Sequence, residues 1–486
     1  MPGLPPITNF VVLMLENRSF DNVLGMLYPY SANFEGLQGN EFNLDSSGNK
    51  ITIANNPTTT LMPPADPGES FEDMNLQIWG NTSGTGSQSL SGFVLDYMAA
   101  AGQYPDIKTS PHIAYPALPR ANAGSAQDIM NYFTTAGANP QLPVTSALAQ
   151  AFAISDSWFG SCPTQTYPNR MFLHSATAGG YVDDFQYILN VSVPNFGSTF
   201  QLLDAGKTPS PANWKIYFHD APLASLLNYY SYQADKNNPG LICNFDNNSI
   251  GPTITPTFLD DVAAGTLPRY SFIEPRYKNY PAPLNLMEND NHPPSDMIFG
   301  EILLANVYNA IRKSAYWTNK NIMLIVIYDE HGGCYDHVVP PAAVAPGGPT
   351  LPPVAWTPPY KPFPTQLFGP RVPAIIISPW VVSSSQSQSA FRPPNFIPNK
   401  PSTGTPFDHT SVISTLNLFF NIGTLTARDA AAPPLGPNIA NLYGDGSNAG
   451  PASVPVPTAP ATMVAKQLAQ PSTALGRLHN LLDPPQ

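Results

Sequence analysis

Short continuous runs of apolar residues are the clearest pattern along the chain, and they predict buried β-strands. The runs cover residues 10–15, 214–218, 270–273, 322–327 and 374–377. A continuous run suits a strand whose two faces are both covered, because successive side chains point to opposite faces of a sheet. We therefore expect a sheet with helices packed on both sides.

Helical patterns lie between these runs. Residues 296–312 carry an apolar stripe at helical spacing and follow a Pro-Pro pair, where a helix start is favoured. Residues 411–420 form a second helical pattern. Strands that alternate with helices predict an α/β fold.

Proline-rich segments predict long loops between these elements. The chain has 57 prolines, and residues 40–68, 342–368 and 436–461 are rich in Pro, Gly, Ser, Thr and Asn. No change in composition is sharp enough to mark a domain boundary. We therefore expect a single domain over residues 1–486, in which residues 436–486 form a loop-rich C-terminal tail that crosses the body.

The charge of the chain argues against several classes of partner. Its 486 residues carry a net charge of −12 and no run of Lys or Arg, which argues against nucleic-acid binding and against adhesion to anionic membranes. No apolar stretch approaches the roughly 20 residues of a membrane span. Three widely spaced cysteines match neither a disulfide framework nor a zinc motif. Because no signal peptide is visible, we expect a cytoplasmic protein by default, or a secreted one if a leader has been removed.

Metal-type ligands follow two of the predicted strands directly. Glu16 and Asn17 come after the first run, and their oxygens suit a divalent cation, although a helix cap would also explain Asn17. The run 322–327 leads into the string YDEHGGCYDH, which holds five metal-type side chains, among them Asp329, Glu330 and His331. Ligands bind at the carboxyl ends of strands in open α/β sheets, so these residues predict a site there.

A hydroxyl-bearing segment and two histidines add to this chemistry. Thr166 stands at the predicted start of a helix, where anions are favoured, and metal coordination could turn its hydroxyl into a nucleophile. Asn169 and Arg170 can donate to phosphate oxygens, and a Pro-rich capping loop is the alternative. His292 and His409 each lie close to an Asp just before a helix, a setting compatible with either a structural or a catalytic role.

The motifs occur in a fixed order over residues 16–412, namely ENRSFDN, TYPNR, HPPSDM, YDEHGGCYDHVVPP and FDHTSV. This series resembles that of the family of bacterial phospholipases C, plant non-specific phospholipases C and bacterial acid phosphatases. The resemblance implies an alkaline-phosphatase-like fold, a three-layer α/β/α sandwich. It also implies site residues, with Glu16, Asn17, Asp329 and Glu330 as metal ligands, Thr166 as nucleophile, Asn169 as a phosphate contact, and His292 and His331 as the catalytic groups around the phosphate and the leaving oxygen. From the residues themselves we add Thr166 as a metal ligand, and Arg170, His409 and Glu69 around the phosphate.

Glu69 departs from the family pattern, which commonly reads DPGH where this chain reads DPGE. A carboxylate beside a phosphate is unfavourable unless it is protonated or binds a cation. Glu69 could recruit a second metal ion, face a cationic head group, or signal reduced activity.

The sequence thus predicts a metal-dependent phosphoesterase in which Thr166 attacks phosphorus and His292 protonates the leaving alcohol. Phospholipase C-type hydrolysis of phospholipids is the main hypothesis, and an acid phosphatase acting on phosphomonoesters is the alternative. A catalytically impaired metal-binding homologue is an alternative of another class. The oxygen ligands suit Mg²⁺, Ca²⁺ or Mn²⁺, and the histidines would admit Zn²⁺ or Fe.

Overall fold

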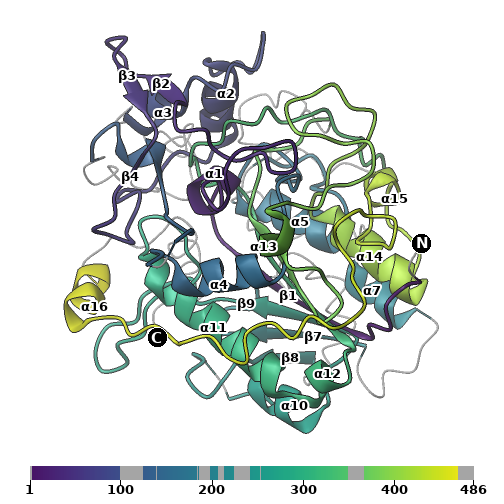
Figure 1. The fold of residues 1–486 in the computed structure, drawn as a ribbon. Helices are drawn as coiled ribbons and strands as arrows, with labels where there is room; N and C mark the ends of the chain where they lie inside the picture. Colours follow the sequence, from purple (N-terminus) through teal and green to yellow (C-terminus); the bar gives the residue numbers. More distant parts are fainter. Residues whose placement is uncertain are drawn as a thin grey trace, which may run out of the picture.

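Seven strands form one central sheet in the computed structural model, which describes residues 3–98, 124–137, 139–182, 184, 197–205, 213–223, 241–251, 253–348 and 366–468 (Figure 1). Across the sheet the order is β6 (Ala153–Ser155), β11 (Ala374–Ile377), β10 (Ile322–Tyr328), β1 (Asn9–Leu15), β9 (Tyr270–Glu274), β7 (Trp214–Phe218) and β8 (Ile242–Asn244). The pairs that include β11 are antiparallel and the other four are parallel. All five strands predicted from apolar runs are confirmed, whereas β6 and β8 were missed because each is only three residues long.

Helices cover both faces of this sheet (Figure 1). On one side lie α4 (Pro143–Ala151), α10 (Phe258–Ala264), α11 (Met297–Lys313) and α12 (Ala315–Thr318). On the other side lie α5 (Thr166–Ser175), α7 (Thr199–Asp204) and α14 (Thr410–Phe420). The predicted three-layer α/β/α fold is therefore confirmed, and the two predicted helices correspond to α11 and α14.

The alternation of side chains decides which helix each strand residue meets. The ring of Phe10 in β1 lies 5.0 Å from that of Phe419 in α14, and Phe272 in β9 lies 4.7 Å from His174 in α5. Every second residue of β1 after Phe10 points to this same face. Glu16, directly after the strand, therefore points towards α5.

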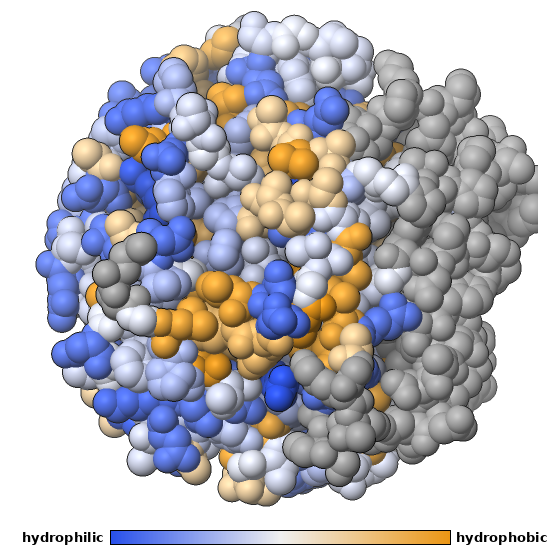
Figure 2. Space-filling model, turned by 90° about the vertical axis from the view of Figure 1, so that its right-hand side faces the viewer, coloured by the Kyte–Doolittle hydropathy of each residue, from blue (hydrophilic) through white to orange (hydrophobic). Residues whose placement is uncertain are grey.

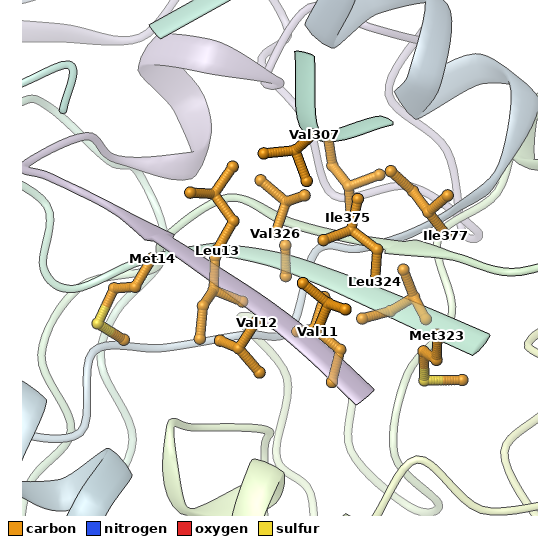
Figure 3. Packing of buried hydrophobic residues seen from close by; sticks show 14 of the residues in the cluster. Val11, Val12, Leu13, Met14, Val307, Met323, Leu324, Val326, Ile375 and Ile377 are labelled. Atoms are coloured by element: carbon orange, nitrogen blue, oxygen red, sulfur yellow. The ribbon is translucent and has the colours of Figure 1, made fainter. Parts of the chain in front are cut away.

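The apolar core fixes the central strands in place. Figure 3 shows side chains of β1, β10 and β11 packed in one cluster with Val307 of α11. Residues 10–15 of β1 are at most 1% exposed, and each such aliphatic side chain contributes about 1.5–3 kcal/mol through burial. The packed core therefore fixes the ends of these strands, and with them the positions of the residues that directly follow.

Smaller elements surround the sheet. The predicted loop 40–68 is wrong in part, because it contains β2 (Phe42–Leu44), β3 (Lys50–Thr52) and β4 (Ala54–Asn55), strands too short to give a sequence pattern. β2 pairs with β3, and β4 pairs with β5 (Asn131–Tyr132). The remaining helices are α1 (Phe20–Val23), α2 (Phe71–Trp79), α3 (Phe93–Met98), α13 (Ser384–Ser387), α15 (Ala427–Ala431), α16 (Ala461–Leu468) and a 3₁₀ turn at Asp128–Met130.

The predicted loop 342–368 lies mostly outside the described residues. The C-terminal tail crosses the molecule along α11 without helix or strand from residue 436 until α16 begins (Figure 1). Figure 2 views the side that carries α14 and α15, where apolar and hydrophilic groups are interspersed over the described surface. None of the described helices combines the length and apolar character needed to cross a bilayer.

Candidate active site

Strands β1 and β10 bring together two motifs that lie more than 300 residues apart. They pair in parallel up to Leu15 and Tyr328, so Glu16 and Asp329 leave the sheet side by side. Asp329 N–H donates to the carbonyl of Leu15 at 3.0 Å, and Asn17 N–H donates to Asp329 Oδ1 at 2.9 Å. The two motifs therefore meet at the carboxyl ends of neighbouring strands.

A buried chain of polar contacts joins Glu16 to α5. The Thr166 hydroxyl donates to Glu16 Oε2 at 3.1 Å, and Arg170, one turn further along, pairs with Glu16 Oε1. Arg170 also pairs with Glu274 at the end of β9, at 3.0 Å. Burial, the largest effect, and the neighbouring Asp329 raise the pKa of Glu16 well above its ordinary value, while Arg170 lowers it. Both Glu16 oxygens are thus engaged, one of them by the predicted nucleophile.

Backbone contacts aim the second oxygen of Asp329 into the site. Its Oδ1 accepts from the N–H groups of Asn17 and of Glu330, the latter at 2.7 Å. Asn17 has a φ of 57°, in the left-handed region that Asn tolerates better than most residues. The buried side-chain amide of Asn17 and Asp329 Oδ2 form no hydrogen bond of good geometry among the described residues, although the Asn17 amide lies close enough to Glu69 to lower the pKa of that carboxyl.

The glycine pair after Glu330 allows a close approach to Asn17. Gly332 has a φ of 61°, and a Cβ at this position would lie 2.2 Å from the carbonyl oxygen of Asn17. Its N–H donates to Glu330 Oε2 at 2.7 Å, which leaves Glu330 Oε1 without a hydrogen-bond partner among the described residues. Burial, with Glu69 and Asp329 nearby, raises the pKa of Glu330 well above its ordinary value.

These unsatisfied atoms fit a divalent cation. A buried polar atom without a hydrogen bond costs about 1–3 kcal/mol, so such atoms are rare unless something else binds them. Three of the predicted ligands have them, namely Asn17, Asp329 and Glu330, and all three offer the hard oxygens that Mg²⁺, Ca²⁺ or Mn²⁺ prefer. The residue types therefore match the predicted metal, but the acidic and histidine side chains of the described residues that lie close enough together to share an ion are Asp21, Asp336 and His337, and Asp66, Glu69 and His292.

The helix start carries Thr166 but is less open than the sequence predicts. Thr166 is the first residue of α5, yet the N–H of Tyr167 donates to Asp184 at 2.7 Å and Pro168 has no N–H. The Asn169 side chain donates to backbone carbonyls, including that of Thr164 at 2.7 Å. The Asn169 side chain thus shapes this loop, whereas Arg170 keeps one buried donor, its Nε, without a hydrogen-bond partner among the described residues.

Two predicted histidines are held by hydrogen bonds. His409 accepts from the indole of Trp158 at 3.4 Å, and its Nε2 lies 2.5 Å from the carbonyl of Asp329, so both ring nitrogens are used and the ring supports Asp329. His331 Nε2 lies 2.7 Å from the side-chain oxygen of Gln77, and its Nδ1 lies 3.2 Å from Glu330 Oε2. Burial lowers the pKa of His331 to about 3, so this ring is neutral.

His292 and Glu69 form a buried ion pair. His292 Nδ1 donates to the carbonyl of Pro293 at 2.6 Å and lies 3.7 Å from Asp66, and its Nε2 lies 3.2 Å from Glu69 Oε1. Burial alone would lower the pKa of His292, but Glu69 and Asp66 together raise it well above the ordinary value. Burial raises the pKa of Glu69 and the His292 charge lowers it, with a net decrease. These three residues could hold a metal ion, but the positive charge of a protonated His292 already compensates the negative charge of Glu69.

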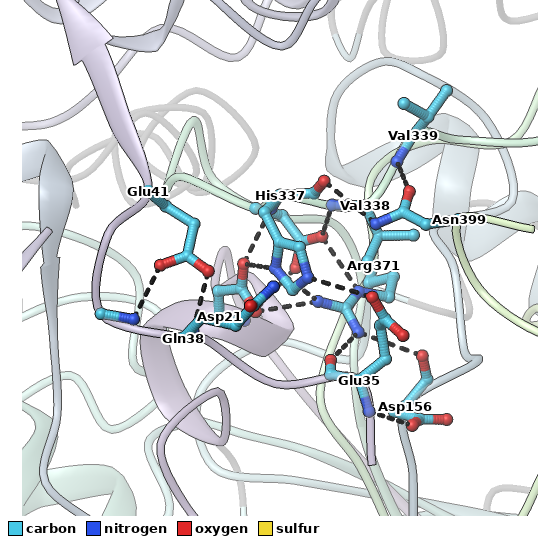
Figure 4. A network of polar contacts seen from close by, with 12 residues as sticks. Asp21, Glu35, Gln38, Glu41, Asp156, His337, Val338, Val339, Arg371 and Asn399 are labelled. Atoms are coloured by element: carbon cyan, nitrogen blue, oxygen red, sulfur yellow. Dashed lines mark hydrogen bonds and ion pairs between the residues drawn. The ribbon is translucent and has the colours of Figure 1, made fainter. Parts of the chain in front are cut away.

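The second half of the YDEHGGCYDH string serves another purpose. Asp336 and His337 join Asp21, Glu35, Asp156 and Arg371 in a buried network, here called the clasp (Figure 4). Arg371 pairs with Asp21 at 2.8 Å and with Asp336 at 2.9 Å. Burial lowers and Asp21 raises the pKa of His337, to about 10.

The clasp could hold a metal ion by composition, but its carboxylates are already bound by Arg371, His337 and backbone N–H groups. It ties the segment after β1 to the segment after β10. Sequence reasoning missed this role because Arg371 is an isolated residue in the sequence, with no motif around it.

The fold is that of an α/β protein with a buried acidic cluster at the carboxyl ends of neighbouring strands, the position where such sheets commonly bind ligands. A model of the phosphoesterase family matches residues 7–423, and the chain belongs to that family. It is therefore a phosphoric ester hydrolase, and the resemblance seen in the motifs is confirmed.

Among the similar proteins are phospholipases C. Non-specific phospholipase C1 of Arabidopsis thaliana is 30% identical over 88% of this chain and 70% of its own length, and non-specific phospholipase C3 of that plant is 31% identical over 88% and 73%. Phospholipase C A of Mycobacterium tuberculosis is 27% identical over 87% and 74%. A solved structure of an alkaline phosphatase superfamily protein from Vibrio parahaemolyticus is 13% identical, with a TM-score of 0.31 over 60% of this chain and 64% of that one.

Proposed function

We propose that this chain is a metal-dependent phospholipase C that cleaves the phosphodiester bond of phospholipids and releases diacylglycerol. The proposal is supported by relatives that carry the name phospholipase C and match about nine-tenths of the chain. The contact between the Thr166 hydroxyl and Glu16 Oε2 is the observation on which the mechanism rests.

Thr166 is the proposed nucleophile. Its hydroxyl donates to Glu16 Oε2, so Glu16 is the proposed acceptor of the proton when the oxygen attacks phosphorus. Arg170 holds the other Glu16 oxygen and keeps the carboxylate aimed at Thr166. Attack forms a phosphodiester on Thr166, which water then hydrolyses.

Asn17, Asp329 and Glu330 are the proposed ligands of a divalent ion, together with Glu16 and Thr166, which the sequence also predicts as ligands. A bound divalent ion would neutralise negative charge on the phosphate and lower the pKa of a coordinated hydroxyl. Without a cation, these carboxylates would repel both one another and the substrate.

His292 is the proposed proton donor to the leaving oxygen. Glu69 and Asp66 keep its ring protonated, which gives Glu69 a role that needs no contact with phosphate. Diacylglycerol is a poor leaving group as an alkoxide, so this proton should contribute about 10²–10⁴ to the rate.

The test compares the purified chain on p-nitrophenyl phosphorylcholine, p-nitrophenyl phosphate and phosphatidylcholine vesicles, with and without chelator. We expect turnover of the two diesters, diacylglycerol as the lipid product, and loss of both reactions with chelator. Asp329→Asn should lose activity and bound metal, whereas the exposed control Asp445→Asn should retain both.

Other outcomes point to the alternatives. Preference for the phosphomonoester would favour an acid phosphatase. Bound metal without turnover of any of the three substrates would contradict the proposal and indicate a binding protein.

A further inference from the structure

The C-terminal helix α16 inserts a single side chain into the body of the protein. Gln467 is fully buried, whereas the other residues of α16 are exposed or half-buried. This helix lies beyond residue 423, where the match to the phosphoesterase family ends. The shared motifs therefore do not account for Gln467.

Both ends of the Gln467 amide are used. Its Nε2 donates to Glu288 Oε1 at 2.6 Å, and its Oε1 accepts from the N–H of Asp296 at 2.8 Å. Glu288 is itself fully buried, so the contact is a hydrogen bond to a carboxyl group in a dry environment, which is stronger than one at the surface. One side chain thus joins two positions that are eight residues apart.

The segment between these two positions carries His292. Within it, Asp290 Oδ1 accepts from the N–H of His292 at 3.0 Å, and the carbonyl of Asp290 accepts from the N–H of Glu16 at 2.7 Å. Asp296 closes the segment, because its side chain caps α11 through the N–H of Ile298. Gln467 therefore bridges the start and the end of the loop that presents the proposed proton donor.

The route of the tail to this point is fixed by α11. The Tyr308 hydroxyl and Arg312 Nε both donate to the carbonyl of Pro451, at 2.5 and 3.1 Å. Asn309 exchanges two hydrogen bonds, each of 2.9 Å, with the backbone of Val454. The tail is thus held along α11 before α16 turns Gln467 inwards.

We propose that Gln467 is a positioning residue, which holds the 288–296 segment so that His292 faces the leaving oxygen of the substrate. This inference rests on the proposed function for its kinetic consequence, but the hydrogen bonds of Gln467 to Glu288 and Asp296 are a property of the fold. Through these two hydrogen bonds the C-terminal tail becomes part of the active-site architecture.

The experiment uses full-length Gln467→Met, which keeps the length of the side chain and removes both hydrogen bonds, with the exposed neighbour Lys466→Met as its matched control. On phosphatidylcholine, kcat should fall roughly tenfold in the Gln467 variant with little change in KM, because the proton donor is misplaced. On p-nitrophenyl phosphorylcholine the loss should be much smaller, since p-nitrophenolate leaves without a proton. A merely structural role would lower both rates alike.

A second measurement separates failure of the inference from failure of the proposed function. Amide hydrogen exchange in residues 288–296 should speed up in Gln467→Met and not in Lys466→Met, whether or not the enzyme turns over a phospholipid. Gln467→Asn, too short to reach both partners, should behave like Gln467→Met and replaces it if the latter does not fold. Unchanged exchange in this segment, or equal rate losses on both diesters, would overturn the proposal.

Discussion

Replacement of Arg371 by methionine should be among the most destabilising single changes in this protein. The guanidinium donates to Asp21 and Asp336 and to the carbonyls of Glu35 and Asp156, the last two at 2.8 and 3.2 Å. Methionine fills a similar volume but removes the charge and these hydrogen bonds. Asp21 would keep its ion pair with His337 within the clasp (Figure 4), whereas Asp336 would lose its ion pair with Arg371.

The expected cost follows from burial. Arg371 is 0% exposed, and removal of one partner from a buried ion pair costs about 3–5 kcal/mol, because the other charge stays buried without compensation. Natural proteins have a free energy of unfolding of about 5–15 kcal/mol, so this loss is a large fraction of the total. Arg371→Lys keeps the charge but a single ammonium cannot span two carboxylates, so we expect about half the loss.

Urea unfolding of the full chain measures the effect, with the exposed Lys400→Met as control, which should stay within about 0.5 kcal/mol of wild type. The double variant with Asp336→Asn should lose less than the sum of the two single losses, since the two residues share one interaction. If Arg371→Met unfolded within about 1 kcal/mol of wild type, the clasp would not be an important stabilising element.

Three further predictions follow from the site and the core. Thr166→Ala should lose several orders of magnitude in rate but keep its metal, and Thr166→Ser should keep part of the rate. Mass spectrometry of acid-quenched wild-type enzyme should find a phosphodiester adduct on Thr166; an adduct on another residue would reject the assignment. Gly332→Ala should weaken metal binding measured by calorimetry, because its Cβ would collide with the backbone of Asn17; an unchanged affinity would show that the loop can shift freely. His174 is packed between aromatic rings without a hydrogen-bond partner among the described residues, and burial lowers its pKa to about 3. Since its unfolded pKa is about 6.5, the stability it contributes is lost as pH falls below that value, by about 2 kcal/mol at pH 5; His174→Phe should flatten the pH dependence of urea midpoints between pH 8 and 5.

Much of the fold could be predicted from the sequence because the central strands are buried on both faces. A strand such as β10 is apolar at every position from Ile322 to Ile327, so the run stands out clearly in the sequence. β2, β3 and β4 could not be predicted, since strands of two or three residues contain too few positions to show a period.

Only those residues of the site that belong to a short sequence motif could be predicted from the sequence. Glu16, Asn17, Asp329 and Glu330 stand directly after strands, so their place at one edge of the sheet follows from the strand pairing. The hydrogen bond of His409 to Asp329 and the ion pair of Glu69 with His292 depend on contacts between distant segments, and the local hydrogen bonds of Asn169 depend on how its loop turns. No sequence period encodes such contacts.

The parallel pairing of β1 with β10 also has a consequence for how the chain folds. Asn17 and Asp329 are 312 residues apart, and at roughly 5–20 residues per second a ribosome needs roughly 15–60 seconds to make that stretch. Contacts of such high sequence separation form slowly. The first strand therefore leaves the ribosome long before its neighbour β10 exists, and its apolar side chains need protection during that interval, either by the nascent chain itself or by a chaperone.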